Sequence, residues 1–304
     1  MCPEQEAIKV NFANKMQVIQ KIVQSEQLVT AYCAATNMPL IDCSNETMND
    51  RAFAFENEEL MKTFMKPWLD RRVLIRGIIF KKPDRIRFFT TLASANIDEL
   101  VYVDKTGISV IRLSDIVKKQ DMSKVPEAAR PVENPSLQMS GLYFIQEASR
   151  AVPPDQKTDL KELEEEFSAN IVKGTFLMPV NLVDSSGENP VPLQPEAPAG
   201  TEGAEGSAAG NVQEPKPGAN QIQFKIPLLK DPKGKTLQPL FTDNVELSKF
   251  NGKKQIRVMK VPFAGLEKLL AKEAEGYILN PGGFHITITS QQLKNLKERF
   301  GTGA

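Results

Sequence analysis

Two stretches that lie far apart in the chain share one pattern, and this repeat constrains the fold more than any other feature. Glu99–Val117 and Glu275–Leu293 align without a gap. Each predicts an apolar strand, a turn that contains Asp or Asn, a glycine, and a second strand whose apolar residues alternate. Because the same order recurs in register, we predict an internal duplication. The identical positions are Glu99 and Glu275, Gly107 and Gly283, and Ser114 and Ser290.

Each predicted hairpin comes late in a unit that mixes helices and strands. Near the start of the chain, a helix at 15–27 precedes the strand "LVTAYCAA". Further on, the helix "KTDLKELEEEFSANIVKG" precedes the strand "TFLMPVNLV" in the same way. The sequence therefore predicts an α+β fold made of two related mixed α/β units. Its parts are a first unit at 15–120, a bridging pair of helices at 134–173, whose second helix opens the next unit, and a second unit at 174–301.

Two local signals mark the bridging helices. Asn134 is predicted to be the N-cap of the first of them, with Pro135 as its first helical residue. The acidic run Glu164–Glu166 in the second helix is predicted to be a solvated face rather than a metal site.

Residues 184–220 differ in composition from the rest of the chain. They are rich in Pro and Gly, contain no aromatic residue and carry more acidic than basic side chains. Such a segment buries too little apolar surface to offset the entropy lost on ordering. We predict a long disordered loop that is inserted in the second unit and leaves the strands on either side in one sheet.

Charge and composition argue against several classes of protein. Lys plus Arg equals Asp plus Glu, at 38 each, so the chain has no general attraction to nucleic acid. Three cysteines without a close pair and one histidine favour neither a disulfide framework nor a metal site. No apolar stretch approaches the roughly 20 residues of a membrane span. We expect a cytoplasmic protein with no metal, no cofactor, no nucleic acid and no membrane.

The sequence offers little catalytic chemistry. His285 is the single histidine, and its strand position places it opposite the buried face. Cys33 is predicted to be a small buried hydrophobe rather than a nucleophile. We therefore predict no catalytic residue, although an enzymatic role stays open.

One group of polar residues is a candidate binding site. Asp243 is predicted to cap a short helix, with Glu246 closing a capping box. Pro281 and Gly282 suit a type II turn, in which the glycine takes a positive φ. If the two preceding strands are neighbours, these loops form one exposed edge. The candidate residues are Phe241, Thr242, Asp243, Asn280, Pro281, Gly282 and His285.

Several motifs of the second unit together resemble a known family. The segments "FLMPVNL", "PLFTDNVEL" and "GYILNPGGFHITIT" resemble the N-terminal domain of the bacterial SseB family, over roughly 160–300. The family is named after an enhanced-serine-sensitivity phenotype. The resemblance implies an α+β fold without an established enzymatic activity. The first unit, with "YCAATNM" and "DKTG" at the matching places, is interpreted as a diverged copy.

These observations lead to one favoured function and two alternatives. We expect a non-enzymatic cytoplasmic protein-binding or regulatory protein whose partner is another protein. The alternatives are a small-metabolite enzyme or accessory protein linked to serine metabolism, and an immunity or secretion-associated scaffold. The oligomeric state is left open.

Overall fold

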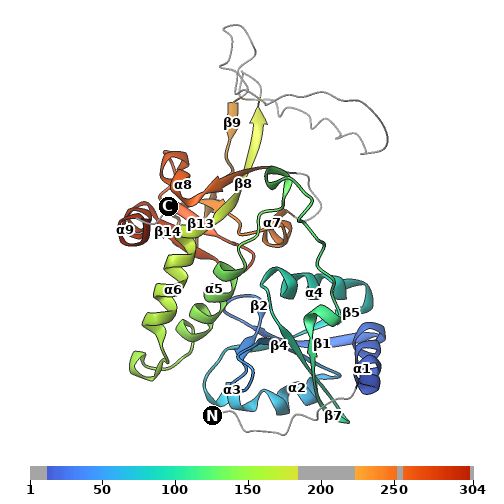
Figure 1. Ribbon diagram of the computed structural model, residues 1–304. Coiled ribbons are helices and arrows are strands. Elements are labelled where there is room, and N and C mark those ends of the chain that lie inside the picture. The colour runs from blue at the N-terminus through green and yellow to red at the C-terminus, as the bar shows by residue number, and fades with distance from the viewer. Residues whose placement is uncertain (1–11, 184–222, 252–255, 302–304) are drawn as a thin grey trace, which may run out of the picture.

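The computed structural model describes residues 12–183, 223–251 and 256–301 (Figure 1). It mixes helices with several sheets, so the predicted α+β class is confirmed. The loop predicted at 184–220 lies outside the described residues.

The first unit contains one sheet, with helices α2 and α3 on one of its faces. The order along the sheet is β5–β1–β4–β6–β7, with the short strands β2 and β3 attached to β1 and β4. The elements are α1 (Phe12–Gln24), β1 (Gln27–Cys33), β2 (Met38–Pro39), β3 (Ile41–Cys43), β4 (Asp50–Phe55), α2 (Glu58–Phe64), α3 (Lys66–Asp70), β5 (Ile75–Lys81), α4 (Arg85–Ser94), β6 (Glu99–Asp104) and β7 (Gly107–Arg112).

Two helices connect this unit to the second one. They are α5 (Pro135–Ala148) and α6 (Leu160–Lys173), which lie side by side (Figure 1). The second unit consists of β8 (Thr175–Val183), β9 (Gln223–Lys225), β10 (Leu229–Lys230), β11 (Thr236–Leu240), α7 (Asn244–Asn251), β12 (Arg257–Pro262), α8 (Phe263–Leu269), β13 (Gly276–Leu279), β14 (Ile286–Thr289) and α9 (Ser290–Phe300).

The two units have the same strand topology. β1 runs antiparallel to β5 as β8 does to β12, and β4 runs parallel to β6 as β11 does to β13. Each unit ends its sheet with an antiparallel hairpin, β6–β7 or β13–β14. In the second unit the strands form two sheets, β10–β11–β13–β14 and β12–β8–β9, and the antiparallel bridge between Leu177 and Phe241 joins them into what we call the second sheet. This bridge matches the pair formed by Val29 and Phe55. The pairing of the strands is therefore of the kind that the predicted duplication requires.

A pair of aromatic side chains repeats as well. The segments "FENEELMKTF" and "FTDNVELSKF" begin at Phe55 and Phe241 and end at Phe64 and Phe250. The ring centroids of Phe55 and Phe64 lie 5.8 Å apart, and those of Phe241 and Phe250 lie 5.3 Å apart. In both units this pair fixes the helix against the strand that precedes it.

The two hairpins also correspond in structure, but their matching residues differ from those in the gapless alignment of Glu99–Val117 with Glu275–Leu293. Leu100 pairs with Ile111, and Tyr277 pairs with Ile288; all four belong to one apolar core. In the structure Leu100 therefore matches Tyr277, which is one residue later than its partner in the sequence alignment. A shift of one residue moves every side chain of a strand to the other face, so burial shows which register is correct.

One hydrophobic core runs through both units. It combines side chains from both sheets, such as Leu28 and Phe176, with Leu142 of α5 and Phe167 of α6. Phe167 stacks on Phe144 and meets the edge of the Phe284 ring. The bridging helices are therefore part of the core.

The opposite faces of the two sheets are covered differently. In the first unit α2 and α3 bury a second apolar cluster, which includes Phe53, Met61 and Trp68. In the second unit α7 packs against Phe241 and its neighbours, through Leu247 and Phe250. The helix α7 thus covers a smaller part of the second sheet than α2 and α3 cover of the first.

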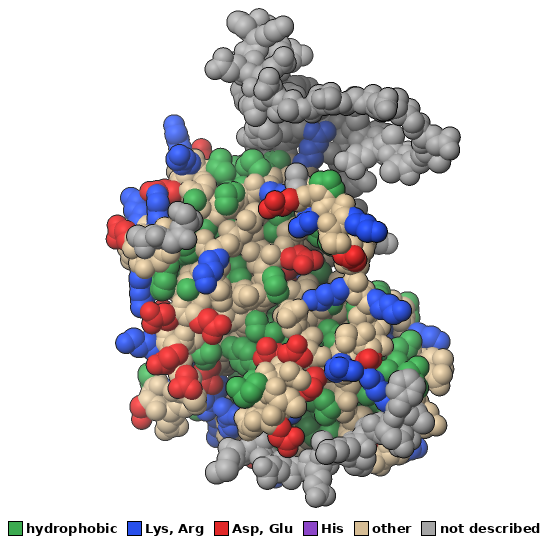
Figure 2. All heavy atoms as spheres, viewed as in Figure 1, with side chains coloured by type: hydrophobic (Ala, Val, Ile, Leu, Met, Phe, Trp, Pro, Cys, Tyr) green, Lys and Arg blue, Asp and Glu red, His purple; other side chains and the backbone are tan. Residues whose placement is uncertain are grey.

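The surface carries charges of both signs. On the face shown in Figure 2, acidic and basic side chains are interspersed. Glu164, Glu165 and Glu166 are exposed, so the prediction of a solvated acidic face on α6 is confirmed.

Candidate functional site

The structure brings the two predicted loops together. β11 and β13 are parallel neighbours, so Thr242 and Asn280 follow adjacent strand ends. The backbone N–H of Thr242 donates to Asn280 Oδ1 at 3.0 Å, and Asn280 Nδ2 donates to Thr242 Oγ1 at 2.9 Å. Two side-chain hydrogen bonds therefore tie the strand-to-helix junction to the hairpin.

The expectation of an exposed edge is wrong. Phe241, Thr242 and Asn280 are fully buried, and Asp243 is 4% exposed. The cover is α5, whose Gln138 donates through Nε2 to Thr242 Oγ1 at 2.6 Å and to Asp243 Oδ2 at 2.5 Å. The local pattern of strand and turn contains no information about a helix packed on it from elsewhere in the chain.

Asn134 occupies the predicted N-cap position of α5 but makes no side-chain cap bond. Its Nδ2 donates to the carbonyl oxygens of Thr175 and Thr242 at 2.7 and 2.6 Å, and its Oδ1 accepts from Thr175 N–H at 3.2 Å. This side chain connects the bridging helices to two strands of the second unit.

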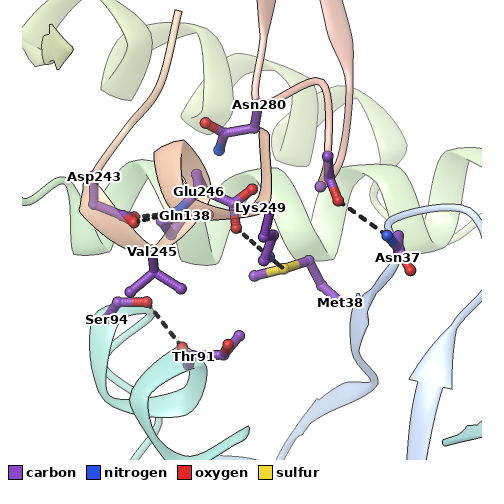
Figure 3. Close-up of polar contacts among 12 residues, drawn as sticks. Asn37, Met38, Thr91, Ser94, Gln138, Asp243, Val245, Glu246, Lys249 and Asn280 are labelled. Atoms are coloured by element: carbon purple, nitrogen blue, oxygen red, sulfur yellow. Dashed lines mark hydrogen bonds and ion pairs between the residues drawn. The ribbon is translucent and has the colours of Figure 1, made fainter. Parts of the chain in front are cut away.

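The helix α7 begins with the predicted cap but not with a capping box. Asp243 Oδ1 accepts from the backbone N–H of Glu246 at 2.9 Å. Glu246 is fully buried, and its Oε1 accepts from Lys249 Nζ at 2.5 Å (Figure 3). Its Oε2 has no hydrogen-bond partner among the residues that the structure describes. Burial raises the pKa of the Glu246 carboxyl above its ordinary value, and Lys249 acts in the opposite direction.

The turn after β13 differs from the predicted type II turn. The N–H of Gly283 donates to the Asn280 carbonyl at 2.8 Å, and the positive φ belongs to Asn280 (49°) and not to Gly282. Both glycines are required by close packing instead. A Cβ on Gly283 would overlap Glu246 Oε2, and one on Gly282 would lie 3.0 Å from Lys249 Cβ.

The same turn contacts the first unit. Asn37, next to β2, donates through Nδ2 to the Gly282 carbonyl at 2.9 Å (Figure 3). Lys249 Nζ lies 2.8 Å from the sulfur of Met38. Most of the predicted site residues thus form a buried polar junction between the units, and a ligand would not reach them there.

Pro281 and His285 lie elsewhere, on an open groove of about 360 Å³ over the outer face of the second sheet. His285 is exposed, and its Nδ1 lies 3.3 Å from the Gly283 carbonyl oxygen. The predicted strand position of His285 is wrong, because the residue precedes β14 and has a φ of 34°. The other lining residues were not predicted from the sequence. The remaining lining residues are Leu229, Lys230, Asp231, Pro232, Leu237, Ile278 and Thr287.

Within the described ranges, no group of three or more His, Cys, Asp or Glu side chains could hold a metal ion. In the same ranges, no helix combines the length and apolarity needed to cross a membrane.

Comparison with known proteins gives a match for most of the second unit. Residues 157–295 match the family model described as the SseB protein N-terminal domain, which confirms the resemblance seen in the sequence. The match begins just before α6 and extends into α9. No curated protein and no solved structure matches the chain.

Proposed function

We propose that this chain, whose residues 157–295 match the family model of the SseB protein N-terminal domain, is a non-enzymatic cytoplasmic protein that binds or regulates another protein. It would bind through the groove on the outer face of the second sheet. One observation carries the proposal: α2 and α3 cover this face in the first unit, whereas in the second it stays open. An apolar face that one copy covers and the other leaves open is a natural place for a partner.

The lining of the groove suits a protein segment. Leu229 and Ile278 provide apolar surface above the buried Leu237, while Lys230 and Asp231 add charges of both signs. Protein interfaces combine an apolar centre with a polar rim in this way. We infer that one or two apolar side chains of the partner enter the groove and that polar groups beside them bond to the rim.

The environment of His285 favours binding over catalysis. A catalytic imidazole needs a nucleophile or an acid within hydrogen-bond reach. Among the described residues, His285 makes no ion pair and no hydrogen bond to a carboxylate, hydroxyl or thiol group.

The test starts with the full chain, immobilised and exposed to lysate of the native host. A protein retained in stoichiometric amount would be purified and its affinity measured by calorimetry. Thr287→Arg places a long cation in the groove, and we expect it to weaken binding about tenfold or more. The control is Val258→Arg, on an exposed position of β12 outside the groove, which should bind as the wild type does.

Two results would contradict the proposal. If Thr287→Arg bound the partner with unchanged affinity, the groove would not be the contact surface. If no protein were retained at all, the protein-binding function itself would be rejected.

A further inference from the structure

The edge strand β5 leaves a row of backbone groups without a partner among the described residues. Ala34 N–H donates to the Leu74 carbonyl at 2.8 Å, and Lys82 N–H donates to the Glu26 carbonyl at 3.2 Å. Bonds to one neighbour alternate along an antiparallel strand, so every second residue from Leu74 to Lys82 bonds to β1. The residues between them direct N–H and C=O away from β1. These are Ile75, Gly77, Ile79 and Lys81.

The corresponding edge of the second unit is blocked. By the same alternation, the outward residues of β12 are Val258, Lys260 and Pro262. Pro262 has no N–H to offer, and Lys260 Nζ donates to the Arg130 carbonyl of a neighbouring loop at 2.5 Å. Pro262 and Lys81 occupy matching places, because each pairs with the first residue of the central strand in its unit. Proline protects an edge strand from pairing because it removes a backbone donor. The edge of β5 has no proline.

Exposed apolar side chains are frequent in the part of the sequence that contains β5. Four of the eight large hydrophobic side chains that are exposed in the described part of the chain fall between residues 69 and 86. Ile79, 47% exposed, is one of the outward residues of β5 itself. The four are Leu69, Leu74, Ile79 and Ile86.

The same region is basic. Between Asp70 and Arg87 the chain has seven Lys and Arg residues against two acidic ones. None of the seven makes an ion pair with any described residue, and five of them also make no side-chain hydrogen bond there, unlike Arg76 and Arg85. These five are Arg71, Arg72, Lys81, Lys82 and Arg87.

We propose that the free edge of β5 binds an extended, acidic segment of a partner protein, which adds a strand to the first sheet. Backbone hydrogen bonds to the outward residues would provide affinity, as in other β-strand additions. The unpaired cations would select acidic side chains in the segment, and the exposed apolar residues would select apolar ones. This site is independent of the groove on the second unit.

The charge pattern decides between this partner and two others. A second copy of the chain paired through β5 would bring Lys81, Lys82 and Arg76 close to the same cations, which is unfavourable. Nucleic acid would use the cations but not the row of outward N–H and C=O groups.

The experiment selects ligands from a phage library of random twelve-residue peptides on the immobilised full chain. A selected peptide is then synthesised, and its affinity is measured by fluorescence anisotropy. Lys81→Pro removes one outward N–H without backbone strain, because φ of Lys81 is already −71°. The matched control is Lys81→Gln, which removes the same charge but keeps the N–H.

We expect the selected peptides to be acidic, and their affinity to fall about tenfold more in Lys81→Pro than in Lys81→Gln. Bound peptide should also slow amide hydrogen exchange at Gly77 and Ile79. Selection of no peptide, or of neutral or basic ones, would overturn the proposal, as would equal binding by the two variants. Displacement of the peptide by random single-stranded DNA with equal affinity would reassign the edge to nucleic acid. A dimer in sedimentation that Lys81→Pro abolishes would reassign it to a second copy.

Discussion

The carboxylate of Glu246 and the backbone of Gly283 are in direct contact, so Gly283 has no room for a side chain. Glu246 lies in α7, and Gly283 lies in the turn after β13. Gly282 of the same turn accepts a hydrogen bond from Asn37 of the first unit. The turn therefore lies between α7 and the first unit, and the effect of disrupting its contact with Glu246 can be measured.

Gly283→Ala should destabilise the protein by about 1–3 kcal/mol, because the methyl group would have to displace the buried carboxylate. Urea unfolding followed by circular dichroism measures this. The control is Gly265→Ala, inside α8, where an added Cβ meets Val261 at an ordinary 3.4 Å. That variant should be neutral or more stable, since Ala favours helices by up to about 1 kcal/mol. Equal stability of the two variants would show that the close contact is unimportant.

The buried pair of Glu246 and Lys249 should respond strongly when one partner is removed. Lys249→Met leaves the Glu246 charge buried without its cation, and we expect a loss of about 3–5 kcal/mol. The double variant Glu246→Leu/Lys249→Met should recover most of it, since the first unit has Leu60 at the place that matches Glu246. Urea unfolding of the three proteins provides the comparison. A double variant as unstable as the single one would refute this account.

The raised pKa of Glu246 gives stability a pH dependence of known sign. A carboxyl group whose pKa is higher in the folded state binds more protons there, so its contribution is most favourable at low pH. That contribution is lost as pH rises from the ordinary value of 4.5 through the raised folded value. Relative to Glu246→Gln, the wild type should therefore lose unfolding free energy over this window. A difference between the two proteins that stays constant from pH 4 to 8 would contradict the raised pKa.

Asn134 should act as a connector and not as a helix cap. Asn134→Asp keeps a good N-cap residue but cannot donate to the carbonyl groups of Thr175 and Thr242. We expect Asn134→Asp and Asn134→Ala to lose about 2 kcal/mol or more each, because buried carbonyl groups are left without a donor. Thermal unfolding distinguishes the two roles: if Asn134→Asp kept wild-type stability, capping would be the main role.

Residues 184–220 should be dispensable for folding, as their composition predicts. β8 and β9, which lie on either side, pair antiparallel, so a short Gly-Ser linker can join them. Since a shorter loop costs slightly less closure entropy, we expect the melting temperature to stay the same or rise slightly. A large decrease would mean that the segment contributes contacts to the fold.

Local patterns were enough to predict much of this protein. The apolar spacing of residues 15–27 and of "TFLMPVNLV" predicted α1 and β8, because the period of a helix or strand is encoded within a few turns. The recurring hairpin pattern predicted two units with one topology. The N-cap at Asp243 was also found, since it depends on residues three positions apart.

Tertiary structure decided what lies on the surface. Thr242, Asp243 and Asn280 have the composition of exposed loops, but α5 buries them with Gln138, which is more than a hundred residues away from any of them. Gly282 has the residue type of a type II turn, but it has no positive φ and instead packs closely against Lys249 of α7. The groove beside His285 is open because no described helix covers it, and the edge of β5 is free because no described strand pairs with it. Such features depend on contacts between distant segments, and a local period of two or 3.6 residues does not encode those contacts.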